Sequence, residues 1–213
     1  MTGRRHTLVT IALCAAMAAG CNGSSEAAGS PAPSPSTTRA TVVTTTAQRG
    51  ANAAVDQAVA ALLDAGSYAF EIAIVLVGDQ TIESVLSGWV DGPDRELHLE
   101  VGDAAVVTRV IDGVATVERD GTVTEIPLQE ADEGPSLGIL RSLDEVVSMS
   151  STEIVGFLDA SVLDRAGFGT TGGADVVLYL TDEGVLAGYR IQTSNGSWTI
   201  DARFTDVGAD SAG

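Results

Sequence analysis

Apolar and polar residues alternate along much of this chain, and short turn sequences interrupt the alternation at regular intervals. Residues 68–76, 97–101 and 198–204 carry apolar side chains at every second position. Turn pairs recur roughly every ten residues, at Asp91-Gly92, Gly102-Asp103, Asp112-Gly113 and Asp120-Gly121. A period of two is typical of strands with one buried face, and such pairs supply the positive φ of tight hairpins. The sequence therefore predicts an antiparallel meander.

Two segments have helical spacing instead. The first carries Val55, Val59, Leu62 and Leu63 on one stripe and ends before Gly66, which is placed to end a helix. The second lies between Glu130 and Ser150, where Pro135 precedes apolar residues near helical spacing, and it predicts a short amphipathic helix or a helical loop.

Strands are expected to resume over residues 152–161, 174–181, 185–193 and 197–206. This order of elements predicts a mostly β (α+β) fold. The expected architecture is one antiparallel sheet with an N-terminal helix and a short helical insertion on one face.

The first twenty residues have the three zones of an export signal. Arg4 and Arg5 precede an apolar stretch of about twelve residues, which is shorter than the roughly 20 that span a bilayer. The sequence Ala18-Ala19-Gly20-Cys21 then resembles the lipobox of bacterial lipoproteins. We therefore expect residues 1–20 to be a signal peptide and Cys21 to carry the lipid, a palmitate-type anchor; ordinary cleavage to a soluble secreted protein is the alternative.

The cysteine count agrees with that expectation. Cys14, the other cysteine, lies inside the apolar stretch and leaves with it, so a mature chain would hold one thiol, at its N-terminus. Residues 22–50 are rich in Ser, Thr, Ala and Pro and predict a flexible tether. The expected organisation is signal peptide 1–20, lipidated cysteine and tether 21–50, and one domain over 51–213. The expected location is outside the cytoplasm, at the cell membrane.

Charge restricts the partners. The formal net charge is −18, and a field of this sign repels nucleic acid. All eleven basic residues among Lys and Arg are arginine, a composition typical of the GC-rich genomes of actinobacteria.

Side chains for catalysis are scarce. His98 is the one histidine beyond the signal, so a transition-metal site lacks ligands and a serine nucleophile lacks a base. The carboxylates lie mainly in expected turns and on polar strand faces. The GxGxxG pattern of residues 167–172 precedes a strand instead of opening a helix, so it predicts a loop. The sequence thus predicts a protein that is not an enzyme and that uses no cofactor.

Several expected strands are apolar on both faces, for example at Val106 and Val107. Either helices cover both faces in a compact core, or one face of a curved sheet lines a cavity. Two short helices are little cover for so many strands, which keeps both interpretations open.

The residues also suggest a family. The lipobox, the tether, the run 62–68 (LLDAGSY), the meander, the helical segment before 152–156 (TEIVG) and the closing runs 176–180, 186–190 and 204–208 together resemble the mycobacterial LppX and LprG lipoproteins. The resemblance covers almost the whole chain, through loose motifs. It implies a half-barrel of antiparallel strands with helices across the concave side, related to the LolA and LolB lipoprotein carriers.

The same resemblance implies a function. The chain is expected to bind a lipid, a glycolipid or a lipoprotein acyl chain in a cavity between sheet and helices, and to help move it across the cell envelope. A non-catalytic regulatory or scaffold lipoprotein that binds an envelope protein on the same fold is the alternative. The expected lining combines the helical cover and the facing strands: Leu137, Leu140, Leu143, Val147, Ile72, Ile74, Leu86 and Val90.

Overall fold

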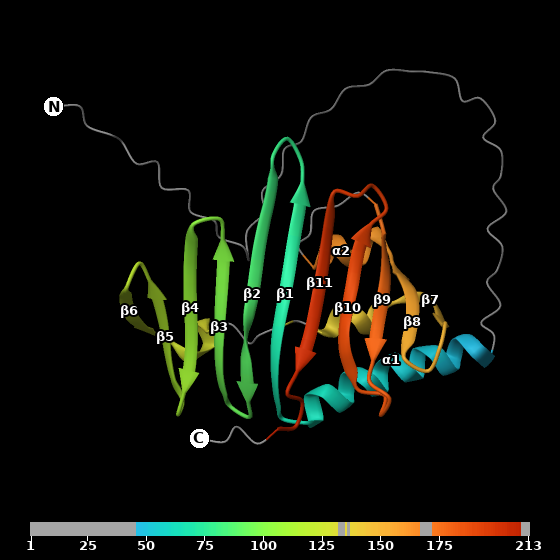
Figure 1. Ribbon diagram of the computed structural model, residues 1–213, viewed down its shortest axis with the longest axis horizontal. Coiled ribbons are helices and arrows are strands. Elements are labelled where there is room, and N and C mark those ends of the chain that lie inside the picture. The colour runs from blue at the N-terminus through green and yellow to red at the C-terminus, as the bar shows by residue number, and fades with distance from the viewer. Residues whose placement is uncertain (1–45, 132–134, 136, 167–171, 210–213) are drawn as a thin grey trace, which may run out of the picture. The chain divides into compact units, whose positions relative to one another are not determined.

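The chain folds into one antiparallel sheet with helical elements on one of its faces (Figure 1). The computed structural model describes residues 46–131, 135, 137–166 and 172–209. The helical elements are α1 (Thr46–Asp64), the 3-10 helices η1 (Leu128–Glu130) and η2 (Leu137–Ser142), and α2 (Ala160–Arg165). The strands are β1 (Ser67–Val77), β2 (Thr81–Asp91), β3 (Asp94–Val101), β4 (Ala104–Ile111), β5 (Val114–Arg119), β6 (Thr122–Ile126), β7 (Asp144–Ser148), β8 (Glu153–Leu158), β9 (Ala174–Leu180), β10 (Leu186–Thr193) and β11 (Trp198–Thr205).

The sheet consists of two meanders joined at their first and last strands. The strand order is β6-β5-β4-β3-β2-β1-β11-β10-β9-β8-β7. β1 pairs with β11 in the middle of the sheet, where Phe70 stands opposite Phe204. β6 and β7 are the two edges, so the sheet is open. The predicted fold class, a mostly β half-barrel with an N-terminal helix and a short helical segment on one face, is confirmed.

α1 packs on the sheet through one stripe of small and branched residues. Ala51, Val55, Ala58, Val59 and Leu62 are all buried, at the spacing of one helix face. The helix ends as predicted: Gly66 has φ +76°, and its amide donates to the Leu63 carbonyl at 3.2 Å. Leu63 itself, expected on the stripe, is 48% exposed, because it lies one position beyond the face that meets the sheet.

The half of the sheet formed by β1 and β7–β11 is covered, and we call it the covered half. α1, η2 and α2 bury their apolar residues in one core with these strands. Figure 1 shows α1 and α2 alongside β8–β11. Fully buried members of this core include Leu62, Leu140, Leu158, Leu163, Leu178 and Leu186. The face of the sheet that carries this core is called the core face below, and the opposite one the outer face.

The half formed by β2–β6 carries much less cover, and we call it the open half. Its own core is a small cluster of Val110, Ala115 and Ala131, with Ile126 packed against it. Ala131 comes directly after η1, so this segment is what meets the sheet there. Leu97 of β3 belongs to the main core instead.

Two hairpins of the open half, at Asp112-Gly113 and Asp120-Gly121, follow the predicted turn chemistry at both residues. Asp112 and Gly113 have φ of +52° and +77°, and Asp120 and Gly121 have +51° and +73°. Positive φ at both central residues is the geometry of a type I′ turn, which matches the right-handed twist of the flanking strands.

Gly88 marks a close approach between β2 and β3. A Cβ atom at this position would lie 1.9 Å from the carbonyl oxygen of Glu96. Only glycine therefore fits at this point of β2, where the open half begins.

Three predicted boundaries need correction. The segment from 137 is a 3-10 helix only as far as Ser142, and Leu143 leads into strand β7 instead of continuing a helix. The strand expected over 152–161 ends at Leu158, and the unpredicted helix α2 follows, capped by Asp159, whose Oδ1 accepts from the Ser161 amide at 2.8 Å. α1 begins at Thr46, inside the range assigned to the tether.

Other expectations fall where the chain is not described. The signal peptide, Cys21 and nearly all of the tether lie outside the described residues. So does the GxGxxG segment, apart from Gly172.

Candidate functional site

Seven of the eight predicted lining residues lie on one side of the molecule. Ile72 is buried on the core face of β1, and Ile74, Leu86 and Val90 are partly buried and pack against the same core. The pairing of Ile72 with Leu86 places their side chains on the same face of the sheet. Leu137, Leu140 and Leu143 belong to that core too.

Val147 lies apart from the other seven. It pairs with Val155 on the outer face and is 52% exposed, whereas its neighbour Val146 is buried in the core. Its position on the opposite face corrects the expectation that it joins the helical cover.

The predicted cover fills the interior of the covered half. Leu140 of η2 is completely buried, and Leu137 and Leu143 are nearly so. They pack in the same core as the α1 stripe and the inward residues of β8–β11. These leucines therefore act as core residues of the covered half.

Beyond that core, the core face continues onto the open half as a mainly apolar surface, in which Ser84, Thr108 and Thr124 are the polar uncharged residues of β2, β4 and the inner part of β6. Leu99, Val101, Val106 and Val117 are only partly buried, and Ile82 is 47% exposed. The cross-strand pairs Leu86–Leu99 and Leu99–Val106 place these residues on the face that carries the core. At one end of this surface, Ala131, which follows η1, packs against Val110 and Ala115. Sequence reasoning named Leu86 and Val90 but missed the rest, although their alternation in β3–β5 was visible.

Charge on the open half is sorted between the two faces. The strand pairings place every acidic residue of β2–β6 on the outer face: Glu83, Asp91, Asp94, Glu96, Glu100, Glu118 and Glu125. The core face of the same strands carries two charged residues, Arg95 and Arg119. The Nη1 atom of Arg95 donates to the Pro93 carbonyl at 3.3 Å.

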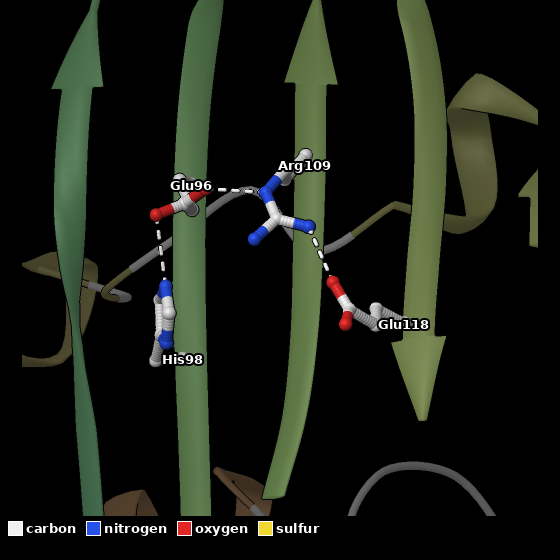
Figure 2. A network of polar contacts seen from close by, with 4 residues as sticks. All are labelled: Glu96, His98, Arg109 and Glu118. Carbon is white, nitrogen blue, oxygen red and sulfur yellow. Dashed lines mark hydrogen bonds and ion pairs between the residues drawn. The ribbon is translucent and has the colours of Figure 1, made fainter. Parts of the chain in front are cut away.

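The outer face of the open half holds a network of four polar side chains on β3, β4 and β5 (Figure 2). Arg109 links two carboxylates: its Nε atom donates to Glu96, and its Nη1 atom donates to Oε2 of Glu118 at 2.8 Å. Nε2 of His98 lies 2.8 Å from Oε1 of Glu96. His98 thus sits on the polar face, as its place between Leu97 and Leu99 predicted.

These contacts shift the pKa values of Glu96 and Arg109. Partial burial by itself would raise the pKa of Glu96, but the hydrogen bonds from His98 and Arg109 outweigh it and hold that pKa below its usual value. Hydrogen bonds to Glu118 and Glu96 raise the pKa of Arg109. Each acid in this network has a base at its side, an arrangement typical of a solvated structural face.

A hollow of about 400 Å³ opens on the outer face of the covered half. Tyr179, Arg190, Asp201 and Arg203 surround Gly188, and Nε of Arg190 donates to Oδ1 of Asp201 at 2.7 Å. A Cβ at Gly188 would lie 2.4 Å from the Ala202 carbonyl oxygen, so close strand packing accounts for the glycine and for the depression above it.

The described part of the chain contains no group of three or more His, Cys, Asp or Glu side chains that could hold a metal ion. Over the same residues, no helix is both long and apolar enough to cross a membrane.

These features define a class of fold: an open antiparallel sheet with one face partly covered by helices and partly apolar and accessible. No protein-family model and no curated protein sequence matches the chain. The chain does match solved structures. It is similar to the lipoprotein LppX of Mycobacterium tuberculosis, with 12% identity, a TM-score of 0.50, and coverage of 76% of this chain and 97% of LppX. It is also similar to LprF of Mycobacterium bovis, with 11% identity, a TM-score of 0.49, and coverage of 76% and 94%. The match to LppX shows that the chain has the fold of this mycobacterial lipoprotein, as the sequence resemblance implied.

Proposed function

We propose that this protein is a non-catalytic envelope lipoprotein that binds a lipid or a lipoprotein acyl chain on its core face and helps to transfer it across the envelope. Cys21, diacylated, anchors it outside the cytoplasm, and the tether holds the domain away from the bilayer. The observation that carries the proposal is the apolar core face, which extends from the covered core across β2–β5 with only partial burial. Contiguous apolar surface of this kind marks a binding site more often than a solvated face.

The position of the proposed site differs from the sequence expectation. Leu137, Leu140 and Leu143 fill the space beneath α1, so the ligand belongs on the open half, against Leu86, Leu99 and Val106. Because the site is a partly open face and not a closed cavity, it suits a ligand that is picked up and released.

Two adjacent valines provide a matched test. Val106 and Val107 are both partly buried, and they point to opposite faces of β4. We use the full chain with Cys21→Ser, which stays unlipidated, and measure binding of dodecanoate, dodecanol and phosphatidylglycerol by native mass spectrometry and calorimetry. Val106→Asp abolishes binding, whereas Val107→Asp leaves it intact. If the parent chain binds none of these probes, the proposal fails.

The anchor has its own test. Metabolic labelling with an alkyne fatty acid marks the wild-type chain and not the Cys21→Ser variant, and the wild type fractionates with membranes. If the wild-type chain is unlabelled and is found in the culture medium, the proposed anchor is wrong. That result has no bearing on the proposed binding face.

A second function, a scaffold lipoprotein that binds a protein partner, has one observation in its favour. The space beneath α1 and η2 is filled by the chain's own leucines, as expected for a carrier fold that has lost its cavity. This alternative predicts saturable binding of one purified envelope protein that lipid does not compete with and that Val106→Asp leaves unchanged.

A further inference from the structure

Arg119 is one of two charged residues on the core face of the open half, the other being Arg95. It is exposed, and it continues a row of apolar side chains that are directly opposite one another on neighbouring strands, Leu86, Leu99 and Val106, with Thr122 of β6 beyond it. Arg119 forms no ion pair with any residue that the structure describes. The arginines of the outer face behave differently, since Arg109 and Arg190 each bind a carboxylate.

The distribution of acidic residues makes this position selective. The chain has 29 acidic residues against 11 basic ones, yet the strands of the open half place none of their acids on the core face. A ligand on this face therefore meets Arg119 without a neighbouring carboxylate on those strands. Asp120 follows Arg119 in the adjoining turn, so the strands leave the guanidinium free of acids on its own face but not at its end of β5. An anion on this face gains from the guanidinium.

We propose that the open half binds an amphiphile with an anionic head group, whose acyl chain lies along Leu86, Leu99 and Val106 and whose head group pairs with Arg119. The inference rests on the proposed function and adds the charge class of the ligand. Three strand spacings separate Leu86 from Arg119, on the order of 14 Å, which is room for an extended run of methylene groups. Apolar contact supplies most of the affinity, and the guanidinium selects the head group.

A single amphiphile fits these features better than the surface of an anionic bilayer. A net charge of −18 repels an extended anionic surface, whereas one head group needs only the local field of Arg119. The experiment must therefore distinguish binding of a single amphiphile from binding to a bilayer surface.

The experiment compares dodecanoate with dodecanol, which have the same carbon chain and differ in charge, on the full chain with Cys21→Ser at neutral pH. We expect dodecanoate to bind more tightly. Arg119→Gln weakens dodecanoate on the order of fivefold, the scale of an exposed ion pair, and leaves dodecanol unchanged. Arg119→Lys keeps most of the preference because the charge remains. Arg203→Gln, which removes an exposed arginine from the outer face, changes neither affinity. The preference for dodecanoate shrinks as salt rises, since exposed charges are screened.

The possible failures are distinct. If neither probe binds, the proposed function itself fails. If both bind with equal affinity, or if Arg119→Gln weakens both equally, the function survives and the role of Arg119 is overturned. Loss of vesicle sedimentation in Arg119→Gln with unchanged dodecanoate affinity would assign this residue to a membrane surface, and a dimer dissociated by Arg119→Gln would assign it to a second copy; either result overturns the inference.

Discussion

The covered and open halves are built from the same kind of strand, yet their side chains differ in burial. In the covered half, β11 alternates buried core-face residues with more accessible outer-face residues along its whole length. In the open half, β2 has no fully buried residue, and its side chains are partly buried or exposed on both faces. Both halves belong to one hydrogen-bonded sheet, so the difference lies in what packs against the core face. An apolar strand face identifies where cover is needed, and the cover itself comes from elsewhere in the chain.

The comparison predicts unequal sensitivity to the same truncation. Leu140→Ala removes a side chain that is completely buried in the covered half, and we expect it to lower the free energy of unfolding by about 3–4 kcal/mol. Leu99→Ala removes a partly buried side chain of the open half and costs about 1 kcal/mol. Urea unfolding of the two variants measures both values. Equal losses would mean that the open half is as tightly packed as the covered half.

At alkaline pH, the burial of Tyr189 in the covered half should lower the free energy of unfolding. Burial raises the pKa of Tyr189 to about 12, so the folded state favours the neutral phenol. This contribution is fully present below the ordinary pKa of 10.0 and is lost as pH rises through about 12; the gap corresponds to about 2–3 kcal/mol. Tyr189→Phe therefore flattens the loss of stability over that pH range. Unfolding curves at stepped pH test this, and parallel losses in the wild type and the variant would contradict it.

Gly88, at the junction between the halves, should not tolerate a larger side chain. Gly88→Ala places a methyl group against the Glu96 carbonyl and forces β2 and β3 apart, at an expected cost of about 2 kcal/mol. Gly138→Ala adds the same methyl group in open space and is expected to be nearly neutral. Amide hydrogen exchange on the variants shows where the strain goes: faster exchange confined to β2–β6 supports an independent open half, and uniform acceleration argues against it.

The smallest effect concerns the outer face of the open half at acid pH. The lowered pKa of Glu96 means that its contribution to stability is present above the ordinary pKa near 4.5 and disappears as pH falls through the lower, folded-state value. Glu96→Gln should cost less than about 1 kcal/mol at neutral pH, and the difference from wild type should vanish in acid. Glu100→Gln, on the same face of β3, serves as the control. A difference that persists at low pH would point to packing and not charge.

The covered half also shows why part of the sequence was misinterpreted. β9, β10 and β11 were predicted almost to the residue because their alternation is regular and tight turns separate them. The spacing of Leu137, Leu140 and Leu143 looked helical up to Val147. In the structure Glu145 has φ +52° and the pairing of β7 shifts between Asp144 and Val147, so Leu143 and Val146, three residues apart, are buried in the same core. The irregularity in β7 therefore gives an apolar spacing like that of a helix. For this reason the sequence pattern predicted Val147 as the inward residue, whereas the structure buries Val146.

The candidate site was predicted only in outline. Ile72, Ile74, Leu86 and Val90 share one face of β1 and β2, as their alternation predicts, and the structure places that face against the core. That these residues line a lipid site stays a prediction. Which part of that face stays accessible depends on where α1 and η2 pack, and no local pattern encodes that position. Arg119 was not singled out for the same reason: only the strand register shows that it shares a face with Leu99 and Val106.

The pairing of β1 with β11 sets the order in which such a chain can assemble. Each meander forms from hairpins between neighbours in sequence, which close quickly, but the central pair joins residues as distant as Phe70 and Phe204. Tyr68 and Phe204 meet edge to face at 5.9 Å across this pair, with Tyr189 beside Phe204 at 6.2 Å. We therefore expect the slow step of refolding to be the docking of two preformed meanders. Substitutions within this aromatic cluster would slow folding, whereas substitutions in β4–β6 would mainly speed unfolding.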